Sequence, residues 1–219
     1  MPEPITLAMV GAGGGSILLL IAKRQFVLFK TALDYVGAFV VAIFAVPVLL
    51  LCALMIKIAD PKGPVIYTQV RVGLNGHLFT IYKLRSMYVD AESKSGAMRA
   101  KSGDDRVIPI CRWMRKSHVD ELPQIYNILR GEMSLVGPRP ERPELFKQLT
   151  KIMPDFEKRL AVKPGLTGLA QIKNGYDVDD DSVKRKLAYD LHYIENMGVR
   201  MELKLLFSTI AKFNDKGAR

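Results

Sequence analysis

The longest uninterrupted run of apolar positions lies in the first third of the chain, at residues 38–56, and contains no charged residue. A straight helix of this length would reach roughly 28 Å, close to the roughly 30 Å hydrocarbon core of a bilayer. A weaker apolar segment at residues 5–22 precedes it and is interrupted by glycines. The pattern predicts a membrane helix in the second segment and leaves open whether the first one also spans.

Two features of the 38–56 run bear on its topology. Pro47 lies near its middle, where proline removes a helix hydrogen bond and bends the axis. Basic residues flank both ends, and the positive-inside tendency would place both ends in the cytoplasm. From the residues alone, a spanning helix and a re-entrant helix that bends at Pro47 both remain open. The flanking basic residues are Lys23, Arg24, Lys30, Lys57, Lys62 and Arg71.

Beyond the apolar run, the pattern changes to that of a small soluble domain. Residues 65–70 and 78–82 alternate in polarity around Asn75-Gly76, a strong turn signal, and predict a β-hairpin. Lys83 and Arg85 follow the second strand at alternate positions, so both side chains are expected on one side. They are either site residues or solvated charges at a strand end.

Helical periodicity dominates the rest of the chain. The last expected helix is basic and amphipathic, which suits either an anionic membrane surface or packing on the domain. Residues 88–106 are polar and predict a loop that could cover a site. The D-x-D-x-D run at residues 177–181 lacks the Gly and Glu of a calcium loop, so a helix N-cap region is expected there. The expected helices cover residues 108–116, 145–160, 183–197 and 201–213, and one more begins at Leu122.

Composition narrows the range of partners. The 219 residues include 32 Lys and Arg against 22 Asp and Glu, a net charge of +10 that favours nucleic acid, an acidic membrane or a phosphorylated substrate. The basic residues are dispersed and Trp113 is the single tryptophan, which argues against a nucleic-acid partner. Cys52 and Cys111 form no disulfide framework or zinc pattern, so a reducing compartment is expected.

The candidate chemistry gathers in residues 118–141. Asp120 and Glu121 are adjacent, and Arg139 follows between two prolines. Carboxylates can attack phosphorus or hold a divalent metal, and a guanidinium can bind phosphate oxygens as a fork. The alternative is that the acidic pair only caps a helix, because a helix N-terminus favours negative charge. The turn-rich loop at residues 163–168 could likewise cradle a phosphate or be an ordinary connection.

Four blocks of sequence resemble the monotopic phosphoglycosyl transferases, also called bacterial sugar transferases, from about residue 29 to residue 213. They are GPVIYTQVRVGLNG, FTIYKLRSM, DELPQIYNILRGEMSLVGPRPE and KPGLTGLAQI. The resemblance implies an α/β, membrane-associated (monotopic) protein with a re-entrant helix bent at Pro47 and a small cytoplasmic domain of short helices and a β-hairpin. Residues 1–25 would form an apolar extension that could enter the membrane, residues 26–60 the re-entrant helix, and residues 61–219 the catalytic domain with interfacial helices.

The resemblance also implies an activity at the cytoplasmic face of a bacterial plasma membrane. A phosphosugar would pass from a UDP-sugar to polyprenol (undecaprenyl) phosphate through an aspartyl-phosphosugar intermediate, which releases UMP and initiates polysaccharide or glycoconjugate synthesis. Anionic lipids are the further expected partner, a homodimer is one option, and the sugar is not fixed. The competing interpretation is a basic membrane-surface adaptor without catalysis. The implied roles are Asp120 as nucleophile, Glu121 as its partner, both as Mg²⁺ ligands, and Lys83, Arg85, Pro138, Arg139 and Pro140 in substrate binding.

Overall fold

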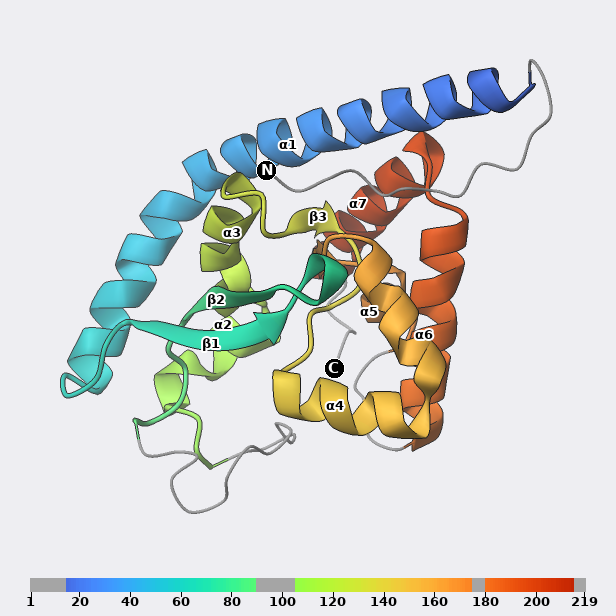
Figure 1. The fold of residues 1–219 in the computed structure, drawn as a ribbon. Helices are drawn as coiled ribbons and strands as arrows, with labels where there is room; N and C mark the ends of the chain where they lie inside the picture. The colour runs from blue at the N-terminus through green and yellow to red at the C-terminus, as the bar shows by residue number, and fades with distance from the viewer. Residues whose placement is uncertain (1–14, 90–104, 175–179, 215–219) are drawn as a thin grey trace.

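The computed structural model describes residues 15–89, 105–174 and 180–214. Within these ranges a long N-terminal helix lies across a small domain made of two short two-stranded sheets and six further α-helices (Figure 1). The predicted covering loop lies mostly outside the described residues, and so does most of the D-x-D-x-D run. The elements are α1 (Gly15–Ala59), β1 (Ile66–Val72), β2 (Leu78–Leu84), α2 (Arg112–Lys116), α3 (Ile125–Leu129), β3 (Ser134–Val136), α4 (Pro143–Ile152), β4 (Gly165–Thr167), α5 (Leu169–Lys173), α6 (Asp180–Glu195) and α7 (Val199–Asn214).

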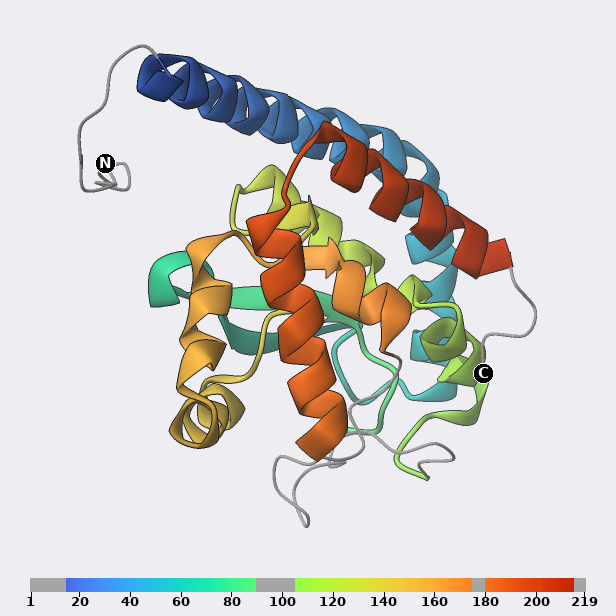
Figure 2. The same cartoon turned by 90° about the vertical axis from the view of Figure 1, so that its right-hand side faces the viewer.

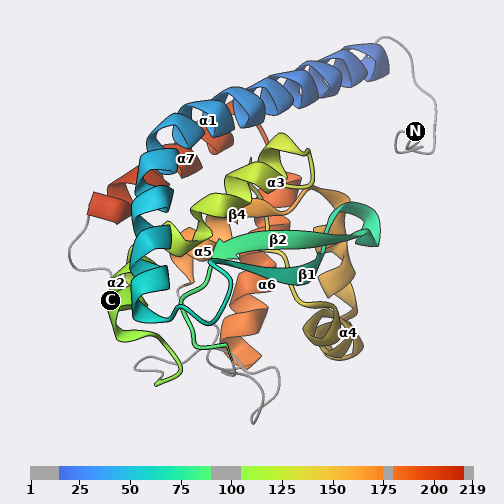
Figure 3. The same ribbon diagram turned by 90° about the vertical axis from the view of Figure 1, so that its left-hand side faces the viewer.

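Helix α1 confirms the apolar helix expected at residues 38–56 but is much longer. It runs without interruption past the division expected after residue 25, and Pro47 lies inside it. Its ribbon changes direction, so that its first part lies across the domain and its last turns descend along one side (Figure 1, Figure 3). Among the described residues, one stretch, Arg24–Ala59, is long and apolar enough to cross a membrane.

The two faces of α1 differ sharply. Asp34, Ala38, Ala45, Cys52 and Ile56 are buried, and their spacing of about one or two turns places them on one stripe that packs against the domain. The opposite side, which we term the outer face of α1, exposes large apolar side chains that a water-facing surface rarely gathers in such number. The outer face comprises Val36, Phe39, Val40, Ile43, Phe44, Leu50, Leu51, Leu54 and Ile58.

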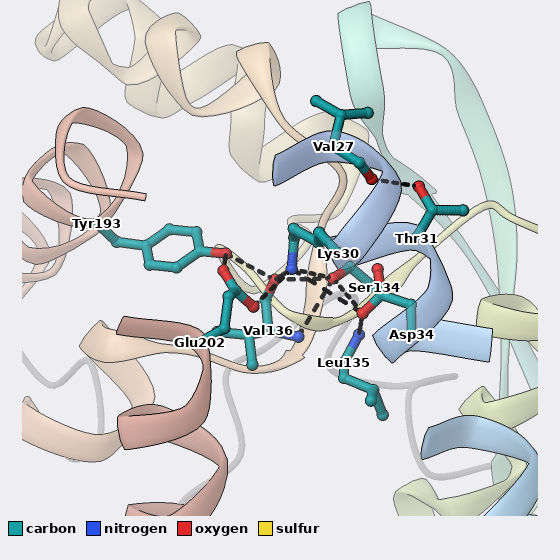
Figure 4. Close-up of polar contacts among 9 residues, drawn as sticks. All are labelled: Val27, Lys30, Thr31, Asp34, Ser134, Leu135, Val136, Tyr193 and Glu202. Atoms are coloured by element: carbon teal, nitrogen blue, oxygen red, sulfur yellow. Dashed lines mark hydrogen bonds and ion pairs between the residues drawn. The ribbon is translucent and has the colours of Figure 1, made fainter. Parts of the chain in front are cut away.

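A buried polar network ties α1 to β3 and α7 (Figure 4). Lys30 Nζ donates to Glu202 Oε2 at 2.7 Å and to Ser134 Oγ at 2.8 Å. Ser134 Oγ donates to Asp34 Oδ1 at 2.9 Å, and the Tyr193 hydroxyl donates to Glu202 Oε1 at 2.6 Å. Because Glu202 is 0% exposed, its charge depends on these partners. The network therefore fixes α1 on the domain.

The predicted hairpin is confirmed, and both strands end two residues later than expected. Asn75 and Gly76 adopt positive φ angles of 53° and 80° at the turn, which these two residue types tolerate. Arg71 lies opposite Phe79, and the strand alternation then places Phe79, Ile81 and Lys83 on the same face as Arg71. One face of the hairpin thus carries two cations, at the two ends of the strand pair.

Strands β3 and β4 form a short parallel pair through very close backbone contact. Gly137 N donates to Thr167 O at 2.8 Å, and Gly165 N donates to Pro138 O at 2.9 Å. A Cβ atom at Gly165 would lie 2.0 Å from Gly137 N, so only glycine fits there. The amide of Gly165 is therefore engaged with the chain, which favours a structural connection at residues 163–168 over a phosphate cradle.

The C-terminal helices follow the predicted periodicity with one division. The helix expected at residues 145–160 ends at Ile152, and a 3-10 helix, Pro154–Ala161, follows because a proline is unfavourable inside an α-helix. Helices α6 and α7 occur where expected. Helix α7 lies beside α1 (Figure 2, Figure 3). Its Phe207 and Ile210 side chains are exposed.

Candidate active site

The Asp120-Glu121 pair lies in the first turn of a 3-10 helix, η3 (Val119–Gln124), directly before α3. The residue before this helix, His118, has a left-handed backbone with φ of 55°, which is uncommon for a residue other than glycine. His118 is also the N-cap residue, and no side-chain capping hydrogen bond forms. Among the described residues, neither carboxylate accepts a hydrogen bond from the helix amides, so any capping by the acidic pair is limited to the favourable effect of negative charge in the first turn.

Glu121 is held between two cations. Lys83 Nζ donates to Glu121 Oε1 at 2.8 Å, and Arg139 donates to both carboxylate oxygens, at 2.9 and 2.5 Å. Burial alone would raise the pKa of Glu121, but the charges of Arg139 and Lys83 hold that pKa well below its usual range. Glu121 is thus an anion at neutral pH, and its hydrogen bonds fix the positions of both cations.

Asp120 has the opposite character. Among the described residues, no side chain donates a hydrogen bond to its carboxylate. Burial and the adjacent charge of Glu121 raise the pKa of Asp120 to about 6, although Lys83, Arg115 and Arg139 act to lower it. A carboxylate with a raised pKa is more basic, and one without partners has its oxygen electrons free for attack. The environment of Asp120 therefore suits a nucleophile.

The segment Pro138–Arg139–Pro140 that carries the guanidinium follows β3 and is anchored at each backbone carbonyl. The carbonyl of Pro138 accepts from the amide of Gly165 in β4 at 2.9 Å. The carbonyl of Arg139 accepts from Arg159 at 2.8 Å, and that of Pro140 accepts from Arg71 at 3.0 Å. With its backbone anchored three times and its side chain paired with the acidic residue, Arg139 is pre-positioned.

A second buried ionic cluster supports this segment from behind. Arg159 Nε pairs with Asp190 Oδ2 at 2.7 Å, and Lys186 pairs with Glu141. All four residues are buried, and they connect α6 to the chain on either side of α4. Asp190 therefore acts as a packing residue that holds Arg159.

Arg85 is the one predicted site cation that the structure does not bring to the acidic pair. It is 5% exposed, and its guanidinium donates to the Pro64 carbonyl at 2.7 Å, to the Asp60 carboxylate and to the Asp60 carbonyl at 2.7 Å. Strand β2 ends at Leu84, so the alternation that would have aligned Arg85 with Lys83 stops one residue too early. Arg85 instead fixes the connection between α1 and β1.

The structure adds residues to the site that were not predicted from the sequence motifs. Arg71 and Gln124 line a small pocket together with Lys83 and Arg139, and the charge of Arg115 in α2 acts on Asp120. The hairpin register, centred on the Asn-Gly turn, would have placed Arg71 on the face of Lys83. No comparable sequence signal distinguished Gln124.

The acidic pair offers carboxylate oxygens of the kind that Mg²⁺ binds. The described residues contain no group of three or more His, Cys, Asp or Glu placed to hold a metal. Mg²⁺ is commonly held by one or two carboxylates together with substrate phosphates and water, and Asp120 and Glu121 fit that role. Because Glu121 already accepts from two cations, metal binding at its oxygens would require those cations to move toward the substrate.

Comparison with known proteins places this site in a family. The family described as "Bacterial sugar transferase" matches residues 25–216, nearly the whole chain. The chain belongs to this family.

Relatives within the family carry names that describe sugar-phosphate transfer. The chain is 40% identical over 188 residues to "Undecaprenyl-phosphate glucose phosphotransferase" of Komagataeibacter xylinus, which covers 84% of this chain and 35% of that one. It is 38% identical to the Aeromonas hydrophila "UDP-N-acetylgalactosamine-undecaprenyl-phosphate N-acetylgalactosaminephosphotransferase", with 87% and 45% covered. The chain thus spans less than half of these two relatives. It matches 96% of "Exopolysaccharide production protein PSS" of Rhizobium leguminosarum bv. phaseoli, at 35% identity and over 86% of its own length.

Proposed function

We propose that this protein transfers a phosphosugar from a nucleotide diphosphate sugar, with UDP as the carrier, to a polyprenol phosphate and so begins the synthesis of a bacterial polysaccharide or glycoconjugate. The observation that carries the proposal is the contrast within the acidic pair. Glu121 is fully engaged with Lys83 and Arg139, whereas Asp120 has no hydrogen-bond partner among the described residues and a raised pKa. The names of the relatives supply the substrate classes.

In the first step, a carboxylate oxygen of Asp120 attacks the phosphorus that bears the sugar. A bond forms between this oxygen and phosphorus, and the bond from phosphorus to the bridging oxygen breaks, so UMP leaves with the electron pair. Lys83 and Arg139 bind the non-bridging oxygens, where charge accumulates during attack. Glu121 holds these two cations in place before the substrate arrives.

In the second step, an oxygen of the polyprenol phosphate attacks the same phosphorus and displaces Asp120. The products are a polyprenol diphosphate sugar and the free carboxylate, so the enzyme is regenerated without a net proton change at Asp120. Dividing the transfer in two lets one small site serve two large substrates in turn. Mg²⁺, held by Asp120 and Glu121 with substrate phosphates, would neutralise diphosphate charge during the transfer.

A membrane-bound acceptor requires a site at the membrane surface, and the exposed apolar residues supply the contact. The outer face of α1 and the exposed Phe207 and Ile210 of the adjacent α7 suit immersion among lipids. We favour a re-entrant α1 over a spanning one, because its ribbon bends (Figure 3), Pro47 lies in the helix, and basic residues flank both ends of its apolar run at residues 38–56. The domain would then lie on the cytoplasmic face, attracted by anionic lipids.

The test is nucleotide release by the purified full chain in nanodiscs with Mg²⁺ and polyprenol phosphate. The donors are UDP-glucose, UDP-galactose and their N-acetylated counterparts, since the relatives' names include both glucose and N-acetylgalactosamine. We expect UMP release from one donor, and loss of nearly all turnover in Asp120→Asn. Asp181→Asn, at an exposed aspartate in a surface pair, is the matched control and should retain turnover.

Two outcomes would contradict the proposal. Substantial turnover by Asp120→Asn would exclude Asp120 as the nucleophile. A folded wild-type protein that binds anionic vesicles but releases UMP from none of the donors would favour the non-catalytic membrane adaptor.

A further inference from the structure

Two buried hydrogen-bond donors in the candidate active site have no partner in the part of the chain that the structure describes. They are the Nε of Arg71 and the side-chain nitrogen of Gln124. Gln124 is only 2% exposed, so water cannot readily satisfy its amide. Buried donors are nearly always paired in folded proteins, and an exception calls for an explanation such as a catalytic role or a bound water or ion. Both residues line the same pocket, between Lys83 and Arg139.

The guanidinium of Arg71 is held in place although one of its donors is unused. Its two terminal nitrogens donate to the Pro140 carbonyl at 3.0 Å and to Gln69 Oε1 at 2.5 Å. Gln69 lies two residues earlier on the same face of β1, so strand geometry contributes to this restraint. Arg71 is therefore pre-positioned and retains a donor for a further acceptor.

The pocket also carries uncompensated positive charge. Arg71 forms no ion pair among the described residues. Glu121 is engaged by Lys83 and Arg139, and Glu141, whose charge does act on Arg71, is paired with Lys186. Burial and repulsion from Arg139 and Arg142 lower the pKa of Arg71 to about 10. Unused donors beside excess positive charge suit an anion that only accepts hydrogen bonds through several oxygens, which is the chemistry of phosphate.

We propose that Arg71 and Gln124 form a second phosphate subsite, which binds the nucleotide's own phosphate in the first step and the lipid's phosphate in the second. This proposal rests on the proposed function. Phosphoryl displacement is in line, so the leaving phosphate lies opposite Asp120. The lipid phosphate must later attack from opposite Asp120 as well, and therefore enters the place that the nucleotide phosphate has left.

Sharing one subsite has a kinetic consequence. UMP and polyprenol phosphate compete for the aspartyl intermediate, and a residue of the subsite affects both. Removal of one charge-assisted hydrogen bond should weaken each of them by roughly 10- to 100-fold. Uridine, which has no phosphate, should be affected little.

The experiment uses the full chain in nanodiscs and three variants. Arg71→Gln removes the charge, and Gln124→Met removes the amide without touching the contact to Pro140. Arg130→Gln is the matched control, since Arg130 is an exposed arginine paired with Glu132. For each variant, calorimetry gives the affinities of UMP, uridine and inorganic pyrophosphate, and turnover gives the KM for polyprenol phosphate. Thermal unfolding establishes that each variant is folded.

The expected result is a parallel loss of UMP affinity and rise in the lipid KM for the two subsite variants, with uridine affinity and the control unchanged. Loss for UMP alone or for the lipid alone would overturn the shared subsite, and unchanged values for both would overturn the subsite itself. Binding of pyrophosphate that depends on Arg71, in a protein that releases no UMP from any donor, would support the subsite while refuting the proposed function.

Discussion

Replacing Asp120 by asparagine should abolish turnover and at the same time stabilise the folded protein at neutral pH. The folded environment raises the pKa of Asp120 to about 6 from an ordinary value of 3.8, chiefly through burial and then through the charge of Glu121. That difference is about 2 pH units, and at about 1.4 kcal/mol for each it disfavours the ionised carboxylate by about 3 kcal/mol. Asp120 is partly exposed, and solvent screening reduces the figure to about 1–3 kcal/mol.

The direction of this stability difference follows from the pH at which Asp120 binds a proton in the folded and in the unfolded protein. Because the folded pKa is the higher one, the stabilising contribution is fully present below about pH 4 and is lost as the pH rises through about 6. Asparagine carries no charge at any pH. Asp120→Asn should therefore exceed the wild type in stability by about 1–3 kcal/mol at pH 7.5, and the two should converge at pH 4.

Thermal unfolding in matched detergent at the two pH values measures this difference. A domain of this size gains about 2–4 °C in Tm for each kcal/mol. If Asp120→Asn were instead less stable than the wild type at pH 7.5, the carboxylate would be a stabilising helix cap and the reasoning from its environment would be wrong.

Four further outcomes follow from the structure. Turnover should fall as the pH is lowered, with an apparent pKa near 6, because protonated Asp120 cannot attack. A turnover rate that does not change between pH 5 and pH 8 would contradict this assignment. Lys30→Met, which removes the cation paired with the buried carboxylates of Glu202 and Asp34, should cost about 3–5 kcal/mol in unfolding experiments, whereas Lys184→Met at an exposed pair should cost under about 1 kcal/mol. Pro47→Ala should straighten α1 and move one helix end to the opposite side of the membrane, as cysteine labelling would show. Unchanged labelling of both ends would count against re-entrance. Gly165→Ala should prevent the pairing of β3 with β4 and lower Tm sharply, and a neutral result would show that the backbones can separate.

Local signals predicted much of the fold. The Asn75-Gly76 turn fixed the hairpin, because few other residues adopt its positive φ angles, and the uncharged run around Pro47 marked the apolar helix. The division after Ile152 could also have been read from Pro154. The continuation of α1 back to Gly15 could not be predicted from the sequence, because the glycines near its start lower helix propensity.

The candidate site was predictable where a short motif carried its geometry. Asp120, Glu121 and Arg139 were identified as a set, and the structure brings Lys83 to the same carboxylate. The position of Arg85 could not be predicted in this way, because its guanidinium pairs with Asp60, and the position of Asp60 depends on where α1 ends. Contacts of this kind depend on tertiary packing between distant segments, which neither periodicity nor spacing encodes.

The anchoring of α1 has a consequence for the lipid substrate. Lys30 and Asp34 join the helix to β3 (Figure 4), and β3 leads within three residues to Arg139, so the position of the helix is coupled to that of the site. The depth to which the helix is inserted in the bilayer then determines how far Asp120 lies from the lipid phosphates. A bilayer that is thinner or thicker should alter the rate with the lipid acceptor while leaving the first release of UMP unchanged.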